Sequence, residues 1–173
     1  MRYSIVKLLI FIPIILLTAC WPTSVSFRDG SVPPEWKRFM VQTLESKAPN
    51  APISYAPDLS EDIKDAIQNR VGLELVSSAS DDPQVNVTGV VQSYDVTPLS
   101  LQDNTAEVKN RLTIRANFEI FISEPEEEVM KVSVSRFADF DAATDVGSIQ
   151  GQLLDEINDQ IVQDVLNKLL SNW

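Results

Sequence analysis

The stretch VKNRLTIRANFEIFIS, residues 108–123, decides the fold, because apolar and polar side chains alternate along it from Arg111 to Ile120. One parity holds Leu112, Ile114, Ala116, Phe118, Ile120 and Ile122. The other parity holds Arg111, Thr113, Arg115, Asn117 and Glu119. A period of two is that of a β-strand, whose successive side chains point to opposite faces of the sheet. The stretch therefore predicts a long strand with one face on a hydrophobic core and one polar face.

A second long strand is expected directly after it. The residues EPEEE, 124–128, form a charged turn, and residues 129–140 bring the chain back with alternating side chains. The inward positions of this run are Met130, Val132 and Val134. A turn centred near Glu126 pairs Ile120 with Val132 and Arg115 with Phe137. This register keeps both apolar faces on the same side of the hairpin.

Three further strands precede this hairpin. Residues 84–96 alternate in the same way, and Pro98 is expected to end that strand because proline lacks the amide hydrogen that a ladder needs. Residues 73–76 predict a short strand before the turn at residues 81–83. Residues 37–46 predict a first strand, in which Phe39 and Val41 alternate with polar residues.

Two helices complete the pattern. Pro49, Pro52 and Pro57 predict a loop, after which Asp58 or Ser60 can cap a helix that ends at Gly72. Its apolar stripe is Ile63, Ala66, Ile67 and Val71. Residues 145–172 repeat apolar side chains every three or four positions, which predicts a long amphipathic helix. The expected fold is α+β, a mostly antiparallel or mixed four-stranded sheet with two helices packed on one face and the other face polar.

The N-terminus has the features of an export signal. Arg2 and Lys7 precede a ten-residue apolar run, residues 8–17, which at about 1.5 Å per residue covers only half of a roughly 30 Å hydrocarbon core. The following Leu17-Thr18-Ala19-Cys20 resembles the lipobox of bacterial lipoproteins, and Cys20 is the only cysteine. A free thiol after a plain signal peptide is the alternative.

These features divide the chain into three parts. We expect a signal peptide at residues 1–19, a lipidated and proline-containing tether at 20–36, in which residues 24–27 can form a short strand, and one α+β domain at 37–173. Lipidation consumes the thiol of Cys20, so no cysteine remains for disulfides, metals or catalysis. More than one acyl chain is what stable membrane anchoring needs.

Composition excludes several classes of function. The 173 residues contain no histidine, and 25 acids against 14 bases give a net charge of −11. Without imidazole there is no Ser-His-Asp device and no His-ligated zinc. The negative charge argues against nucleic acid, and removal of residues 1–19 with their two bases makes it −13. Neighbouring acids such as Glu61-Asp62 and Asp155-Glu156 fall on predicted exposed positions, so we expect no enzyme, no metal and no cofactor beyond the lipid on Cys20.

The bases are more informative than the acids. Lys109, Arg111, Arg115 and Lys131 share the polar parity of the hairpin and form a candidate face for an anionic ligand or a partner. A solvated sheet face, partly neutralised by Glu119, is the alternative. Arg136 has the inward parity, which favours a paired or strand-end arginine over a ligand contact.

Several runs together resemble the LptE lipoproteins, which assemble lipopolysaccharide in the outer membrane of Gram-negative bacteria. These are residues 109–114 (KNRLTI), residues 136–141 (RFADFD), the closing Asn172-Trp173, and Gly89 with Tyr94 and Pro98. The resemblance implies a non-enzymatic plug and assembly factor for an LptD-type β-barrel, in contact with lipopolysaccharide and anchored by lipid in the outer membrane. The domain would then face the periplasm or the barrel lumen. A tethered periplasmic module for a different partner and a hydrolytic lipoprotein with a carboxylate pocket remain the alternatives.

Overall fold

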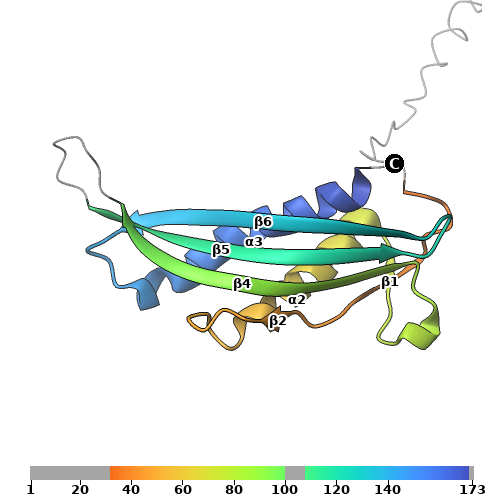
Figure 1. Ribbon diagram of the computed structural model, residues 1–173, viewed down its shortest axis with the longest axis horizontal. Helices are drawn as coiled ribbons and strands as arrows, with labels where there is room; N and C mark the ends of the chain where they lie inside the picture. The colour runs from red at the N-terminus through yellow and green to blue at the C-terminus, as the bar shows by residue number, and fades with distance from the viewer. Residues whose placement is uncertain (1–31, 100–107, 172–173) are drawn as a thin grey trace, which may run out of the picture.

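The computed structural model describes residues 32–99 and 108–171, which form one sheet with helices on one side (Figure 1). Its six strands run in the order β3-β1-β4-β5-β6, and β2 lies beside β4. Their bounds are β1 Arg38–Val41, β2 Glu45–Ser46, β3 Glu74–Leu75, β4 Val85–Leu99, β5 Lys109–Ile122 and β6 Glu128–Asp141. The helices are α2 Tyr55–Ala66, continued by the π-helical turn η2 Ile67–Val71, the short 3₁₀ turn η3 Ala79–Asp81, and α3 Val146–Leu170.

The predicted α+β class is confirmed, but the sheet has six strands rather than four. The expected first strand divides into β1 and β2, both parallel to β4. The division has a local cause, because the amide of Leu44 donates to Ser60 Oγ of α2 at 2.9 Å instead of to a neighbouring strand. The parallel pairs on one side and the antiparallel β4-β5-β6 ladder on the other make the sheet mixed.

The long hairpin forms as predicted, with a different register. Ile120 lies opposite Met130, and Arg115 lies opposite Ser135, so the predicted pairing was wrong by two residues. The turn is shorter than expected and is centred near Pro125. A shift of two leaves every side chain on its predicted face, since the side-chain period of a strand is two.

Pro98 does not end β4, which continues to Leu99. At Pro98, β4 pairs with β5 on one side, where Asn110 lies opposite the proline. On its other side neither β1 nor β2 extends this far along β4. Sheets tolerate proline at such an edge, because its missing amide hydrogen is not needed for a second ladder.

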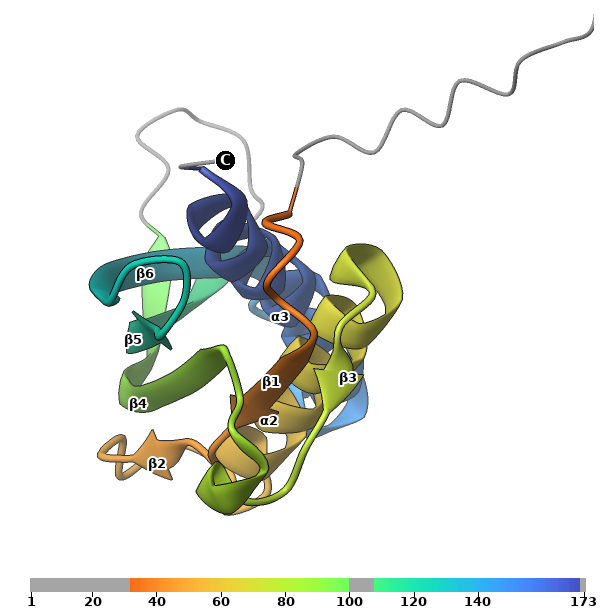
Figure 2. The same ribbon diagram turned by 90° about the vertical axis from the view of Figure 1, so that its right-hand side faces the viewer.

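The two helices cover one face of a curved sheet (Figure 2). The first begins at Tyr55, earlier than predicted, because Pro57 is accepted within the first turn, where helix amides have no acceptor. It ends as expected at Gly72, whose φ of 81° is left-handed. The predicted stripe of α3 is buried from Leu153 onward, at Leu153, Ile157, Ile161, Val165 and Leu169, whereas its first two members, Val146 and Ile149, are only partly buried. Over residues 32–99 and 108–171 no helix combines the length and apolar composition that a membrane crossing requires.

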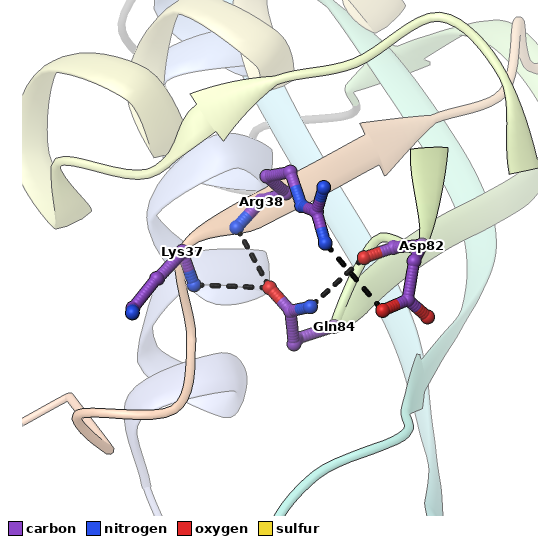
Figure 3. A network of polar contacts seen from close by, with 4 residues as sticks. All are labelled: Lys37, Arg38, Asp82 and Gln84. Atoms are coloured by element: carbon purple, nitrogen blue, oxygen red, sulfur yellow. Dashed lines mark hydrogen bonds and ion pairs between the residues drawn. The ribbon is translucent and has the colours of Figure 1, made fainter. Parts of the chain in front are cut away.

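A buried glutamine fastens the start of the sheet (Figure 3). The side chain of Gln84 accepts hydrogen bonds from the amides of Lys37 and Arg38 at 3.1 and 2.9 Å, and its Nε2 donates to the carbonyl oxygen of Asp82 at 2.8 Å. Arg38 also lies 3.4 Å from the Asp82 carboxylate. These contacts hold the ends of β1 and β4 together where the tether enters the domain.

Candidate functional site

The four predicted bases lie on the side of the sheet that the helices leave open. Lys109, Arg111 and Arg115 come from β5, and Lys131 comes from β6. We call this surface the polar sheet face and define it by these bases together with Ser93, Asp95, Thr113, Asn117, Glu119, Ser133, Ser135, Phe137 and Asp139. The buried residues of β5 all have the opposite parity, so the face contributes nothing to the main core.

Arg111 makes the best-formed contact on this face. Its Nε and one terminal nitrogen donate to the two carboxylate oxygens of Asp139 at 2.6 and 2.8 Å, and its guanidinium carbon lies 3.7 Å from the centre of the Phe137 ring. The hydrogen bond from Arg111 lowers the pKa of Asp139, and the charge of Lys109 lowers it further. The pair is therefore a charged, two-point contact held over an aromatic ring.

The other bases are also compensated. Arg115 lies 3.2 Å from the carboxylate of Asp95 and donates to Ser93 Oγ at 3.2 Å. Lys131 lies 3.1 Å from Glu119. In the part of the chain that the structure describes, Lys109 has no ion pair within 4.0 Å and lies opposite Asp141 in the β5-β6 ladder.

The polar sheet face is thus a balanced mosaic rather than the basic strip that the sequence suggested. Sequence reasoning recognised Glu119 as a neutraliser but missed Asp95 and Asp139. Alternation from Val91 assigns Asp95 to the core face, but an irregularity between Val91 and Ser93 reverses the parity of β4 beyond it. Asp139 could have been found, because it shares the parity of Lys131.

Arg136 is paired, as its inward parity indicated. Its Nε and a terminal nitrogen donate to the carboxylate of Asp164 on α3 at 2.6 and 2.5 Å. The pair ties β6 to α3 at the edge of the sheet and serves the fold.

The acidic helices form a second polar region. A hollow of about 310 Å³ between α2 and α3 is lined in part by Asp62, Asp155 and Asp159. The hydroxyl of Tyr55 donates to Asn158 Oδ1 at 3.0 Å, and Asn158 Nδ2 donates to the Asp62 carboxylate at 2.8 Å. Burial, followed by the charges of the neighbouring acids, raises the pKa of Asp62. The described ranges contain no group of acids that could hold a metal ion.

A curved mixed sheet backed by two helices is a fold that this chain shares with solved bacterial proteins. It is similar to lipoprotein B from Nitrosomonas europaea, at 15% identity and a TM-score of 0.51 over 79% of this chain and 83% of that one. It is also similar to a putative neuraminyllactose-binding hemagglutinin homolog from Helicobacter pylori, at 15% identity and a TM-score of 0.52 over 82% and 85%. At these identities the likeness concerns the fold alone.

The family follows from the sequence match. The model of the LptE family, described as lipopolysaccharide-assembly, matches residues 41–169. The chain therefore belongs to the LptE family, non-enzymatic lipopolysaccharide-assembly lipoproteins that partner the LptD barrel in the outer membrane. No curated protein sequence matches this chain.

Proposed function

We propose that this protein is a lipid-anchored plug and assembly factor for an LptD-type β-barrel, with Cys20 as the lipidated residue. The domain then lies in the barrel lumen or at its periplasmic mouth. Membership of the LptE family supports the partner. The observation that carries the plug role is the polar sheet face, on which Arg111, Arg115 and Lys131 each have an acid within 3.2 Å.

The interior of a membrane barrel is polar, and it therefore suits a surface that offers donors and acceptors of both signs. The polar sheet face has this character and carries hydroxyl and amide groups between its ion pairs, at Thr113, Asn117, Ser133 and Ser135. A plug of this kind works by occupancy. It fills the lumen, gives barrel strands a surface on which to close, and breaks no covalent bond.

Direct binding of lipopolysaccharide by this face is the less favoured role. An anionic headgroup would have to displace Asp139 from Arg111 or Asp95 from Arg115, and both acids would then repel it. In the part of the chain that is described, Lys109 is the base of the four that has no ion pair within 4.0 Å. We propose that contact with lipopolysaccharide, where it occurs, is made at the Lys109 end of the face.

A charge exchange tests which feature the barrel recognises. Arg111→Asp breaks the pair with Asp139, whereas Arg111→Asp with Asp139→Arg restores an ion pair of opposite orientation. We expect the single variant to lower stability slightly, as the loss of an exposed ion pair does, and the exchange to recover most of that loss. Both should reduce co-purification of the barrel about tenfold, because in each variant the partner meets an acid at position 111 in place of a base.

A matched control is Lys64→Asp with Glu61→Lys on α2, which exchanges the charges of a pair 2.8 Å apart on the helix side of the domain rather than on the polar sheet face. It should leave barrel recovery unchanged. Normal recovery with the Arg111 exchange would remove the polar sheet face from the interface. If depletion of the protein leaves the barrel folded and surface lipopolysaccharide unaffected, and no barrel co-purifies, the tethered module for another partner becomes the better account.

A further inference from the structure

The outer edge of β6 is long, regular and uncovered in the part of the chain that the structure describes. β6 is the last strand of the sheet and pairs there only with β5. Its ladder runs from Glu128 to Asp141 without a register shift, and no proline interrupts it. Proteins usually protect such an edge with a bulge, a proline, charges or a covering segment. The central residues 132–135, Val-Ser-Val-Ser, carry no charge.

The edge also borders a hollow that can receive a strand. This hollow has a volume of about 420 Å³ and is lined by Val132, Ser133, Val134, Ser135, Arg136 and Asp164. It therefore lies where β6 faces α3. Val132 is only partly buried, so an apolar side chain placed there would cover more of it.

The point at which the N-terminal segment enters the domain indicates which segment can pair with the outer edge of β6. Val32 packs against the core, and the indole nitrogen of Trp36 donates to the carbonyl oxygen of Glu124 at 2.7 Å. The described chain therefore starts beside the turn at which β6 begins (Figure 1). A segment that approaches Val32 along the edge of β6 runs antiparallel to it, the orientation in which two strands pair with perpendicular hydrogen bonds.

We propose that residues 24–31 of the tether pair with the outer edge of β6 as a further antiparallel strand. Ser24-Val25-Ser26-Phe27 alternates in the same way as residues 132–135. A register in which apolar side chains oppose each other sets Phe27 opposite Val132 and Val25 opposite Val134. Val25 and Phe27 then face the hollow, and both serines lie on the side of the polar sheet face.

This pairing changes where the lipid is attached relative to the domain. The same register places Cys20 level with Asp139, at the end of β6 remote from the turn. Eleven residues at about 3.3 Å each move the anchor about 36 Å along the sheet, toward the Lys109 end of the polar sheet face. The inference does not depend on the barrel partner, and its test is independent of it.

Disulfide formation tests the register in the full-length lipoprotein in its membrane. Ser26→Cys with Ser133→Cys, and Ser24→Cys with Ser135→Cys, are conservative pairs that the register sets directly opposite, within the Cα separation of a disulfide. The matched control is Ser26→Cys with Ser77→Cys, because Ser77 is exposed after β3 at the other edge of the sheet. Mass spectrometry of the joined peptides separates these bonds from any bond to Cys20.

We expect the two β6 pairs to form at least tenfold more disulfide than the control. Equal disulfide yields in all three variants would show that residues 24–26 contact both edges of the sheet equally often, and this result would overturn the proposal. Bonds between two chains through Ser133 would overturn it in favour of a second copy at the edge.

Amide hydrogen exchange on the purified full chain provides a second measurement. The amides of residues 130–136 that point away from β5 should be protected, and Ser26→Pro should raise their exchange rates about tenfold, whereas Ser26→Ala should not. Protection that appears only after the barrel is added would assign the edge to a strand of the partner and overturn the proposal.

Discussion

At the level of single residues, a short series of hydrogen bonds joins the two helices where their buried contact meets the acidic hollow. Tyr55 is 1% exposed and donates to Asn158, which in turn donates to Asp62. Tyr55 and Asn158 are buried, whereas Asp62 lies at the exposed end of this series. Buried polar groups stabilise a fold only when each one keeps its partner. This series of hydrogen bonds therefore makes the packing of α2 on α3 sensitive to the loss of one hydroxyl group.

Tyr55→Phe removes that hydroxyl and leaves Asn158 Oδ1 without its donor. We expect the free energy of unfolding to fall by about 1–2 kcal/mol, measured by urea denaturation. Tyr94→Phe is the control, because Tyr94 is the acceptor of a partly buried bond from Gln150 at 3.0 Å and should cost less. Equal losses in the two variants would contradict a special role for these buried hydrogen bonds.

Asp62 gives the protein a dependence on pH. Its pKa is raised by burial and by neighbouring acids, so the folded state holds the proton more tightly than the unfolded state. Its contribution to stability is therefore present below the unfolded pKa of about 4 and is lost as pH rises through the folded pKa. Asp62→Asn should raise the thermal midpoint at pH 7 and have little effect near pH 4. Asp81→Asn in η3 is the control, and an equal gain there would argue for net charge as the cause.

At the level of elements, β4 is the strand in which local irregularity matters most. The shift between Val91 and Ser93 turns Asp95 toward the polar sheet face, while Tyr94, 6% exposed, faces the helices. Before the shift, Gly89 lies opposite Phe118 where the sheet has no room for a side chain. The same strand therefore packs tightly against β5 at Gly89, before the shift, and presents the acid Asp95 on the polar sheet face after it.

Gly89→Ala should destabilise the protein by about 1–3 kcal/mol through overpacking. An added Cβ would lie 2.6 Å from Phe118 Cδ1, 2.8 Å from Leu44 Cδ2 and 3.0 Å from the carbonyl oxygen of Asn117. Gly151→Ala in α3 is the control, since nothing lies within 4 Å of its Cβ, and it should gain about 0.5–1 kcal/mol. Calorimetry that finds both changes neutral would contradict the packing at Gly89.

At the level of the whole molecule, one end of the sheet receives the N-terminal part of the described chain. The bond from Trp36 to Glu124 and the contacts of Gln84 fix the start of β1 against the β5-β6 turn. The N-terminal end of the described chain is therefore held directly against the sheet by hydrogen bonds. Cys20 itself lies outside the described residues, and its lipidation remains a prediction from Leu17-Thr18-Ala19-Cys20.

Cys20→Ala should abolish incorporation of a radiolabelled fatty acid and leave an unprocessed precursor of higher mass. The lipobox chemistry requires the thiol, and the chain has no second cysteine to replace it. Thr18→Ser is a control that keeps the thiol and should be processed normally. Undiminished labelling of Cys20→Ala would reject lipidation at this residue.

The sequence alone determined the fold class, the inward parity of β5 and β6, the buried stripe of α3 and the αL glycine that ends the first helical segment. These features follow from side chains a few residues apart, and local periodicity records them directly. Tertiary structure alone decided that β1 and β2 lie parallel to β4, that Ile120 pairs with Met130 rather than with Val132, and that Asp95 turns toward Arg115. Each of these depends on a loop length, a bulge or a partner many residues away, whose energy is realised only when the strands are paired.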